Sequence, residues 1–140
     1  MPPASPSDLA FKINRLFAEA NWEELRSALH DDVEVRSFVS PGRTLRGVDA
    51  VLASSEEARG TLYNVKLDTI RELSPTVAVG TGSVRYEHPD GGIATTQTAW
   101  VWRFEDGKLL RSFTFGTLDD ALKAAEAELG DTSDDDEPFV

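Results

Sequence analysis

Arg85 and Glu87 are the residues of this 140-residue chain whose types and spacing are most suited to catalysis. They stand two apart in a predicted strand, so both side chains leave the same face of it. A carboxylate can act as a general acid or base when its surroundings hold it in place. Such a pair would serve a hydrolase, isomerase or cyclase, with Ser37 or Tyr63 as further polar groups.

The same pair has a structural interpretation, an ion pair on the solvent or dimer face of a sheet. Apolar Val84 and Tyr86 leave the opposite face and favour this interpretation. Val77 and Val79, however, stand an even number of positions before the charged pair and would lie on the same face of the strand. A β-bulge would have to decide which of the two sets points inward.

The two histidines do not have the spacing of a metal site. His30 closes a predicted helix, where an imidazole can bind the last carbonyl groups, and His88 stands at a strand end and is expected to face water. The chain has no Cys, which excludes disulfides, thiolate catalysis and Cys-ligated metals. We expect no metal and no cofactor.

A hairpin over residues 93–115 organises the elements that must position these groups. Asp106-Gly107 predicts its turn, because Gly accepts the positive φ that tight hairpin turns need. Trp100, Trp102 and Phe104 alternate along the first strand and form an apolar wall. We expect the helices before and after the hairpin to cover this wall and to leave a pocket beside it.

Three helices are predicted before the long strands. Ser7 caps the first, and Asn21 with Glu24 gives the second a capping-box pattern. The third covers residues 48–59. The first helix has an apolar face at helical spacing, formed by Leu9, Ile13, Leu16, Phe17 and Ala20.

Strand patterns with a period of two alternate with these helices and then replace them. They precede the hairpin at residues 33–35, 44–46, 63–67 and 77–88. A last helix begins at a Thr117 cap and stops at Gly130. This arrangement predicts an α+β fold, a strongly curved antiparallel sheet wrapped around the N-terminal helices as a cone. Apart from the short segment 44–46, the order is α-α-β-α-β-β-β-β, followed by the C-terminal helix.

We expect one domain over residues 8–130, between a flexible leader at 1–7 and an acidic, disordered tail at 131–140. The net charge is −11, with no basic stripe, so neither nucleic acid nor an acidic membrane surface is an expected partner. No long apolar run or signal-like start is present, and a cytoplasmic location is expected.

The order of elements resembles the nuclear transport factor 2-like superfamily, and within it the SnoaL-like and ketosteroid-isomerase-like proteins. Four segments carry the resemblance over about residues 9–129: NWEEL at 21–25, LHDDV at 29–33, GVDAV at 47–51 and RFEDGKL at 103–109. The resemblance implies a cone-shaped sheet with helices at its mouth, an enclosed pocket and a dimeric protein.

The resemblance does not imply ketosteroid isomerisation. Those isomerases use a carboxylate base, a tyrosine and a protonated carboxylic acid. Counted from Asp31-Asp32 without gaps, the three positions fall on Ser37, Ile13 and Trp100, none of which can do that chemistry. Arg85 and Glu87 resemble instead the Arg-x-Asp pair of the limonene epoxide hydrolases, which share the cone. In that chemistry carboxylates activate a water while an arginine holds them in place.

Three functions therefore stay open. The chain is expected first to be a SnoaL-like cone domain that binds a small apolar molecule. The alternatives are an enzyme that uses Arg85 and Glu87, and a protein-interaction module. For the first, the predicted pocket has aromatic walls and is lined by Trp100, Trp102, Ile13, Phe17, Val35, Ser37 and Tyr63.

The outer face of the hairpin predicts a homodimer. Thr95, Gln97, Ala99, Val101 and Arg103 alternate with the inward tryptophans and form a nearly uncharged row. Pairing with a second copy would remove that face from water.

Overall fold

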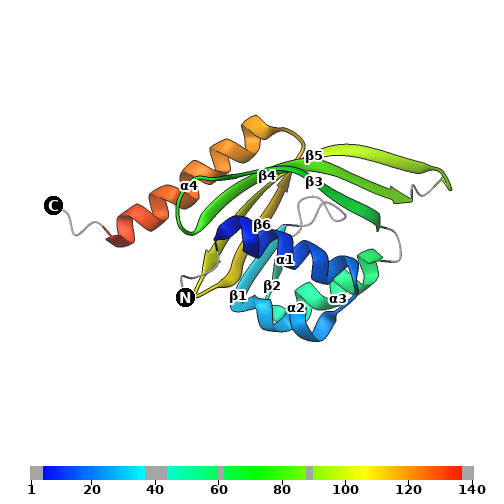
Figure 1. The fold of residues 1–140 in the computed structure, drawn as a ribbon, viewed down its shortest axis with the longest axis horizontal. Coiled ribbons are helices and arrows are strands. Elements are labelled where there is room, and N and C mark those ends of the chain that lie inside the picture. Colours follow the sequence, from blue (N-terminus) through cyan, green and yellow to red (C-terminus); the bar gives the residue numbers. More distant parts are fainter. Residues whose placement is uncertain (1–4, 37–43, 60–61, 88–89, 137–140) are drawn as a thin grey trace.

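A computed structural model describes residues 5–36, 44–59, 62–87 and 90–136, with side chains at all of these positions except 57–59, 62–63 and 131–136. The first half is α1 (Pro6–Ala18), α2 (Trp22–Ala28), β1 (Leu29–Arg36), β2 (Thr44–Arg46) and α3 (Val48–Arg59). The second half is β3 (Leu62–Glu72), β4 (Val77–Glu87), β5 (Ile93–Glu105), β6 (Lys108–Phe115) and α4 (Leu118–Asp136). Figure 1 shows the sheet curving around α1.

The strands form a six-stranded sheet in the order β2-β1-β6-β5-β4-β3. This is the predicted α+β architecture, with one difference: the sheet is mixed, because β1 pairs with β6 in parallel. The segment 44–46 is a true strand that pairs antiparallel with β1. Register shifts interrupt β3 opposite β4, and such bulges bend a strand and increase its twist.

The turn between β5 and β6 confirms the hairpin prediction. Asp106 and Gly107 both have positive φ, at 54° and 75°, and Glu105 pairs with Lys108 across them. Positive φ at both central residues gives the turn the same sense of twist as the strands that it joins.

Helix α1 begins earlier than the sequence predicted. Its cap is Ser5, whose hydroxyl accepts the backbone N–H of Asp8 at 3.2 Å, and Pro6 occupies the first helical turn. Proline has no N–H to satisfy and a φ suited to this position, so the helix starts before the predicted Ser7 cap. The backbone N–H of Ser7 instead donates to the Glu72 carboxylate of β3 at 3.1 Å. Hydrogen bonds from the side chain and from the backbone of Ser7 lower the pKa of Glu72.

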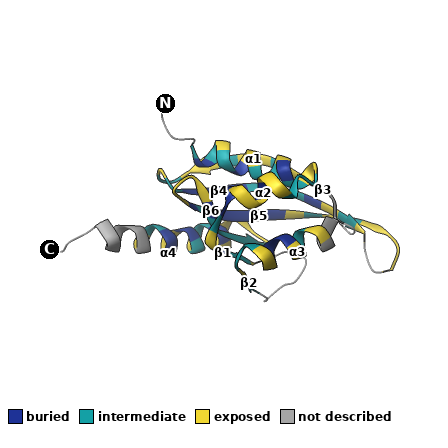
Figure 2. Ribbon diagram, turned by 90° about the horizontal axis from the view of Figure 1, so that it is seen from below, coloured by how far each residue is buried: buried dark blue, intermediate teal, exposed yellow. Residues whose placement is uncertain are grey.

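The C-terminal helix covers the other face of the sheet, and not the tryptophan wall as predicted. Ala121 and Ala125 of α4 pack with Val77, Val79, Ala99 and Val101 in a second hydrophobic cluster. Figure 1 shows α4 and α1 on opposite sides of the sheet, and Figure 2 shows buried residues along both helices. The tryptophan side is already covered by α1, so the remaining apolar sheet surface is on the outer face.

A buried ionic cluster joins α4 to the sheet. Glu128 Oε1 lies 2.8 Å from Nη1 of Arg111 and 3.4 Å from Nη1 of Arg103. Only 8% of the Glu128 side chain and 12% of the Arg103 side chain is exposed. Arg103, assigned from the sequence to an outer dimer face, therefore serves the contact with α4.

Helix α4 runs to Asp136, beyond the predicted stop at Gly130. Glycine ends a helix when it adopts a positive φ, and Gly130 does not. The predicted disordered tail is thus helical as far as residue 136, and 137–140 lie outside the described residues. Among the helices that the structure describes, none is long and apolar enough to cross a bilayer.

We predict that Glu128→Gln lowers the free energy of unfolding by about 2 kcal/mol, measured by urea denaturation. Removing one partner of a fully buried ion pair costs about 3–5 kcal/mol, and the partial exposure of Arg111 reduces this. The matched control is Glu126→Gln, an exposed glutamate on the same helix, which should change stability by less than about 0.5 kcal/mol. Equal losses for both variants would contradict the anchoring role.

Candidate functional site

A cavity of about 190 Å³ lies between the inner face of the sheet and the helices α1 and α3. Its walls combine apolar and small polar side chains from both layers. Its lining residues are Ala10, Ile13, Asn14, Phe17, Val35, Leu45, Val51, Ser54, Ser55, Val65, Leu67, Val84, Trp100, Trp102, Ser112 and Thr114.

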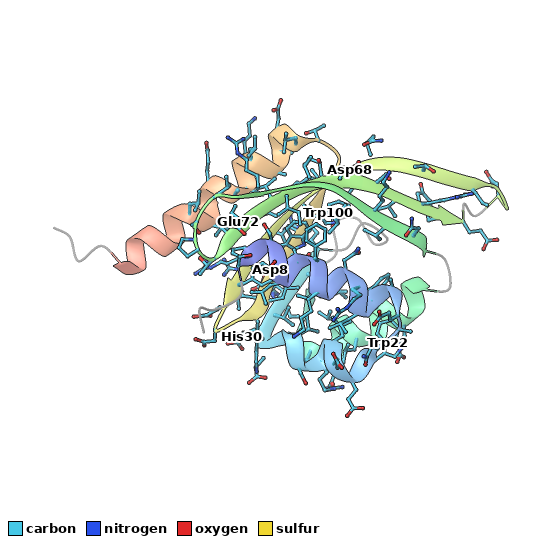
Figure 3. The ribbon with its side chains drawn as sticks, viewed as in Figure 1. Asp8, Trp22, His30, Asp68, Glu72 and Trp100 are labelled. Atoms are coloured by element: carbon cyan, nitrogen blue, oxygen red, sulfur yellow. The ribbon has the colours of Figure 1, made fainter. Side chains whose placement is uncertain are left out.

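Two stacked tryptophans form the floor of the cavity. The rings of Trp100 and Trp102 lie 6.0 Å apart between centroids and 10° from parallel. In Figure 3 the Trp100 side chain lies between the sheet and α1. Offset stacking of this kind gives a flat, polarisable surface that favours contact with another flat apolar group.

Gly80 of β4 makes room for this floor. A Cβ atom at Gly80 would overlap the six-membered ring of Trp102, so only glycine lets the ring lie against the strand. Gly82 is different, because a Cβ there would overlap the Lys66 backbone at a bulge of β3. Gly80 therefore sets how closely the Trp102 ring approaches β4, whereas Gly82 allows the close approach of β3.

The roof comes from one face of α1. Ala10, Ile13 and Phe17 recur at helical spacing and point to the cavity, while Leu16 packs in the core on the adjacent face. The ring of Phe17 meets Trp22 edge to face, with centroids 6.1 Å apart. This contact holds the end of the roof against α2.

The polar lining is neutral. It consists of Asn14, Ser54, Ser55, Ser112 and Thr114, and the hydroxyl of Ser55 already donates to the Val51 carbonyl at 2.8 Å. No lining residue in the described part of the chain carries an acid, a base or an imidazole. The described residues also contain no cluster of three His, Cys, Asp or Glu that could hold a metal ion.

Five of the residues that the sequence assigned to the pocket line this cavity: Trp100, Trp102, Ile13, Phe17 and Val35. Ser37 lies in 37–43, outside the described residues, and the side chain of Tyr63 is likewise outside them. Sequence reasoning missed Ser112 and Thr114, although their alternation along β6 was a signal. Each pairs with one of the tryptophans, Ser112 with Trp102 and Thr114 with Trp100.

Arg85 and Glu87 do not reach the cavity. Pairing between β4 and β5 continues without a shift from Val77 to Glu87, so no bulge exchanges the two faces of β4. Val84 points to the cavity, whereas Arg85 and Glu87 are exposed on the outer face. Val77 and Val79 share that outer face and are buried there by α4, which is why both faces of β4 have an apolar part.

His30 does not cap a helix as predicted. It lies in β1, where its Nδ1 accepts the backbone N–H of Asp32 at 3.0 Å. Its Nε2 lies 3.5 Å from the Glu105 carboxylate at the end of β5. His88 is outside the described residues.

The cone of sheet and helices around this cavity is the nuclear transport factor 2-like fold. Residues 12–112 match the SnoaL-like domain family, and the chain therefore belongs to that family. No curated protein matches the sequence at a significant level.

Solved structures with the same fold include enzymes and a ligand-binding protein. Delta 5-3-ketosteroid isomerase from Mycobacterium sp. has a TM-score of 0.69 and 20% identity, over 83% of this chain and 96% of that one. Protein Rv0760c from Mycobacterium tuberculosis, solved in complex with estradiol-17beta-hemisuccinate, has a TM-score of 0.67 and 17% identity, over 79% and 92%. A candidate polyketide cyclase from Pseudomonas putida KT2440 has a TM-score of 0.66 and 15% identity, over 87% and 98%.

We predict that Gly80→Ala displaces Trp102 and lowers the free energy of unfolding by about 1–3 kcal/mol, the usual cost of overpacking. The change should also alter the near-ultraviolet circular dichroism of the stacked tryptophans. Gly92→Ala is the matched control, because a Cβ there meets no atom within 4 Å and should leave both measurements unchanged. An unaltered tryptophan spectrum in Gly80→Ala would contradict the role assigned to Gly80.

Proposed function

We propose that the protein binds a small apolar molecule in the cavity beneath α1. The observation that carries the proposal is the lining itself: stacked tryptophans, aliphatic walls and, among the described residues, only neutral polar groups. Ligand sites in proteins are typically apolar concavities with a few polar groups that orient the ligand. The steroid-type ligand of Rv0760c supports such a use of the fold.

Binding fits this lining better than catalysis does. General acid–base chemistry needs an ionisable group within hydrogen-bond reach of the reacting atom. The carboxylate of Glu87, which the sequence offered for that work, is exposed on the outer face of the sheet. Bound ligand would instead gain from burial of its apolar surface, at roughly 25 cal/mol per Å².

Toluene is a suitable first probe, and the indole N–H signals of the three tryptophans report its position by NMR. We expect saturable shifts of the Trp100 and Trp102 signals and a smaller shift for Trp22, which lies on α2 away from Trp100 (Figure 3). The Trp22→Phe variant identifies the Trp22 signal and leaves the two signals of Trp100 and Trp102.

The control for this experiment is Glu87→Gln, which should leave toluene affinity unchanged within about twofold. A loss of toluene binding in Glu87→Gln would indicate that toluene binds on the outer face of the sheet and not in the cavity. Shifts that do not saturate, or that are spread over the whole surface, would overturn the proposal.

We also propose that the chain forms a homodimer through the part of the outer sheet face that α4 leaves uncovered. The apolar part of the predicted interface, Ala99 and Val101, is buried by α4. The remainder is more polar, with exposed Thr95, Gln97 and Arg85 and the half-buried ring of Phe113. A face of this composition suits a reversible interface rather than an obligate one.

Sedimentation at micromolar concentration is expected to give twice the 15.3 kDa of the chain. Gln97→Lys would place like charges on both halves of a two-fold interface and should shift the equilibrium toward monomer. Lys123→Gln, on the exposed side of α4, is the control and should leave it unchanged. A monomer at every concentration tested would refute the dimer.

A further inference from the structure

The hydroxyls of the lining gather on one side of the tryptophans, the polar side, among the apolar side chains of Val35, Leu45 and Val51, whereas the lining on the other side is apolar throughout. On the β4-β3 side of the tryptophans the lining is aliphatic, with Val84, Val65 and Leu67. On the β6 side it carries two hydroxyls, those of Ser112 and Thr114. Helix α3 packs beyond them on β1 and β2 and adds Ser54 and Ser55 to the same polar side.

Apart from Ser55, whose hydroxyl donates to the Val51 carbonyl, the polar side chains of the described lining do not use their hydrogen-bonding capacity within the protein. In the described part of the chain, no hydrogen bond joins the side chains of Ser54, Ser112 or Thr114 to another protein group, and the same holds for Asn14 on α1. None of these groups is a sealed polar atom, because the described residues contain no fully buried side-chain N or O without a partner. An occupant of the cavity can therefore bond to them.

The volume of the cavity limits the size of that occupant. An engineered apolar cavity of about 150 Å³ holds one benzene molecule. At about 190 Å³, this cavity has room for one aromatic ring with a short substituent. A molecule of several fused rings would have to extend beyond it or displace the tryptophan floor.

The charge of the lining limits the occupant further. No Lys, Arg or His lines the cavity among the described residues, and the whole chain carries a net charge of −11. An anionic ligand would lose its hydration without gaining a cationic partner, which is strongly unfavourable. A neutral hydroxyl or carbonyl group also gives up hydrogen bonds to water when it enters the cavity. Ser and Thr hydroxyls can replace these bonds, because a hydroxyl both donates and accepts.

We infer that the site takes a neutral one-ring aromatic molecule with a hydroxyl or carbonyl group, its polar end at Ser112 and Thr114 and its ring along the tryptophans. The inference rests on the proposed binding function and names the class of ligand. Thr114 and Ser112 together recognise the polar end, since both line the cavity and each pairs with one of the two tryptophans.

The test compares four probes by the Trp100 and Trp102 indole signals and by competition with toluene: 4-ethylphenol, ethylbenzene, 4-ethylbenzoate and estradiol. We expect 4-ethylphenol to bind about fivefold more tightly than ethylbenzene, the effect of one neutral hydrogen bond. The anion 4-ethylbenzoate should bind at least about tenfold more weakly than 4-ethylphenol. Estradiol should compete at least about tenfold more weakly than 4-ethylphenol, because most of it would have to extend beyond the cavity.

The double variant Ser112→Ala/Thr114→Val removes both hydroxyls and keeps the approximate shape of the wall. It should abolish the preference for 4-ethylphenol and leave the affinity for ethylbenzene within about twofold. Thr95→Val makes the same chemical change on the outer face of β5 and should leave the preference intact. If the double variant is unstable to heat, the single variant Ser112→Ala replaces it. It should reduce the ratio of the 4-ethylphenol affinity to the ethylbenzene affinity by at least about twofold.

The outcomes separate the two proposals. Failure of toluene, ethylbenzene and 4-ethylphenol alike to bind the wild-type protein would overturn the binding function itself. Tight binding of estradiol or of 4-ethylbenzoate, or an unchanged preference in the double variant, would overturn the ligand class while leaving a binding site in place.

Discussion

Burial of both faces of β5 is the constraint on which the rest of the structure depends. Side chains of a strand alternate between two faces, so Trp100 and Trp102 point to one side and Ala99 and Val101 to the other. All four are buried, each at 8% exposure or less. Two separate layers are needed to cover them, and the chain supplies α1 on the inner side and α4 on the outer side.

The two layers differ in how completely they fill their space. Small residues on both sides, Ala121 and Ala125 against Ala99 and Val101, let α4 lie close to the sheet. Under α1 the large rings hold the helix away from the sheet, and the space between them is left partly open. This space is open enough for water to enter, and a bound molecule would gain by removing the apolar walls from water, at roughly 25 cal/mol per Å².

The charged groups of the described residues lie away from the cavity. Among the described residues, Arg26 and Asp49 form an exposed ion pair, and Glu128 pairs with Arg103 and Arg111 under α4 on the outer face. The described lining of the cavity has none. The isomerase compared above shares the fold at 20% identity, and a fold alone does not transfer a reaction. Chemistry in this family depends on which side chains the cone places inside.

The sequence by itself determined the local features of this protein. Alternation, glycines and caps predicted the order of helices and strands, the Asp106-Gly107 turn and the inward direction of Trp100 and Trp102, because these depend on residues near one another in the chain. Tertiary structure decided what depends on contacts between distant segments. Arg85 and Glu87 could not be assigned to a face from β4 alone, since Val77 and Val84 made both faces apolar. Only the packing of α4 against Val77 and Val79 resolved that choice, and only the pairing of β6 with β5 placed Ser112 and Thr114 beside the tryptophans.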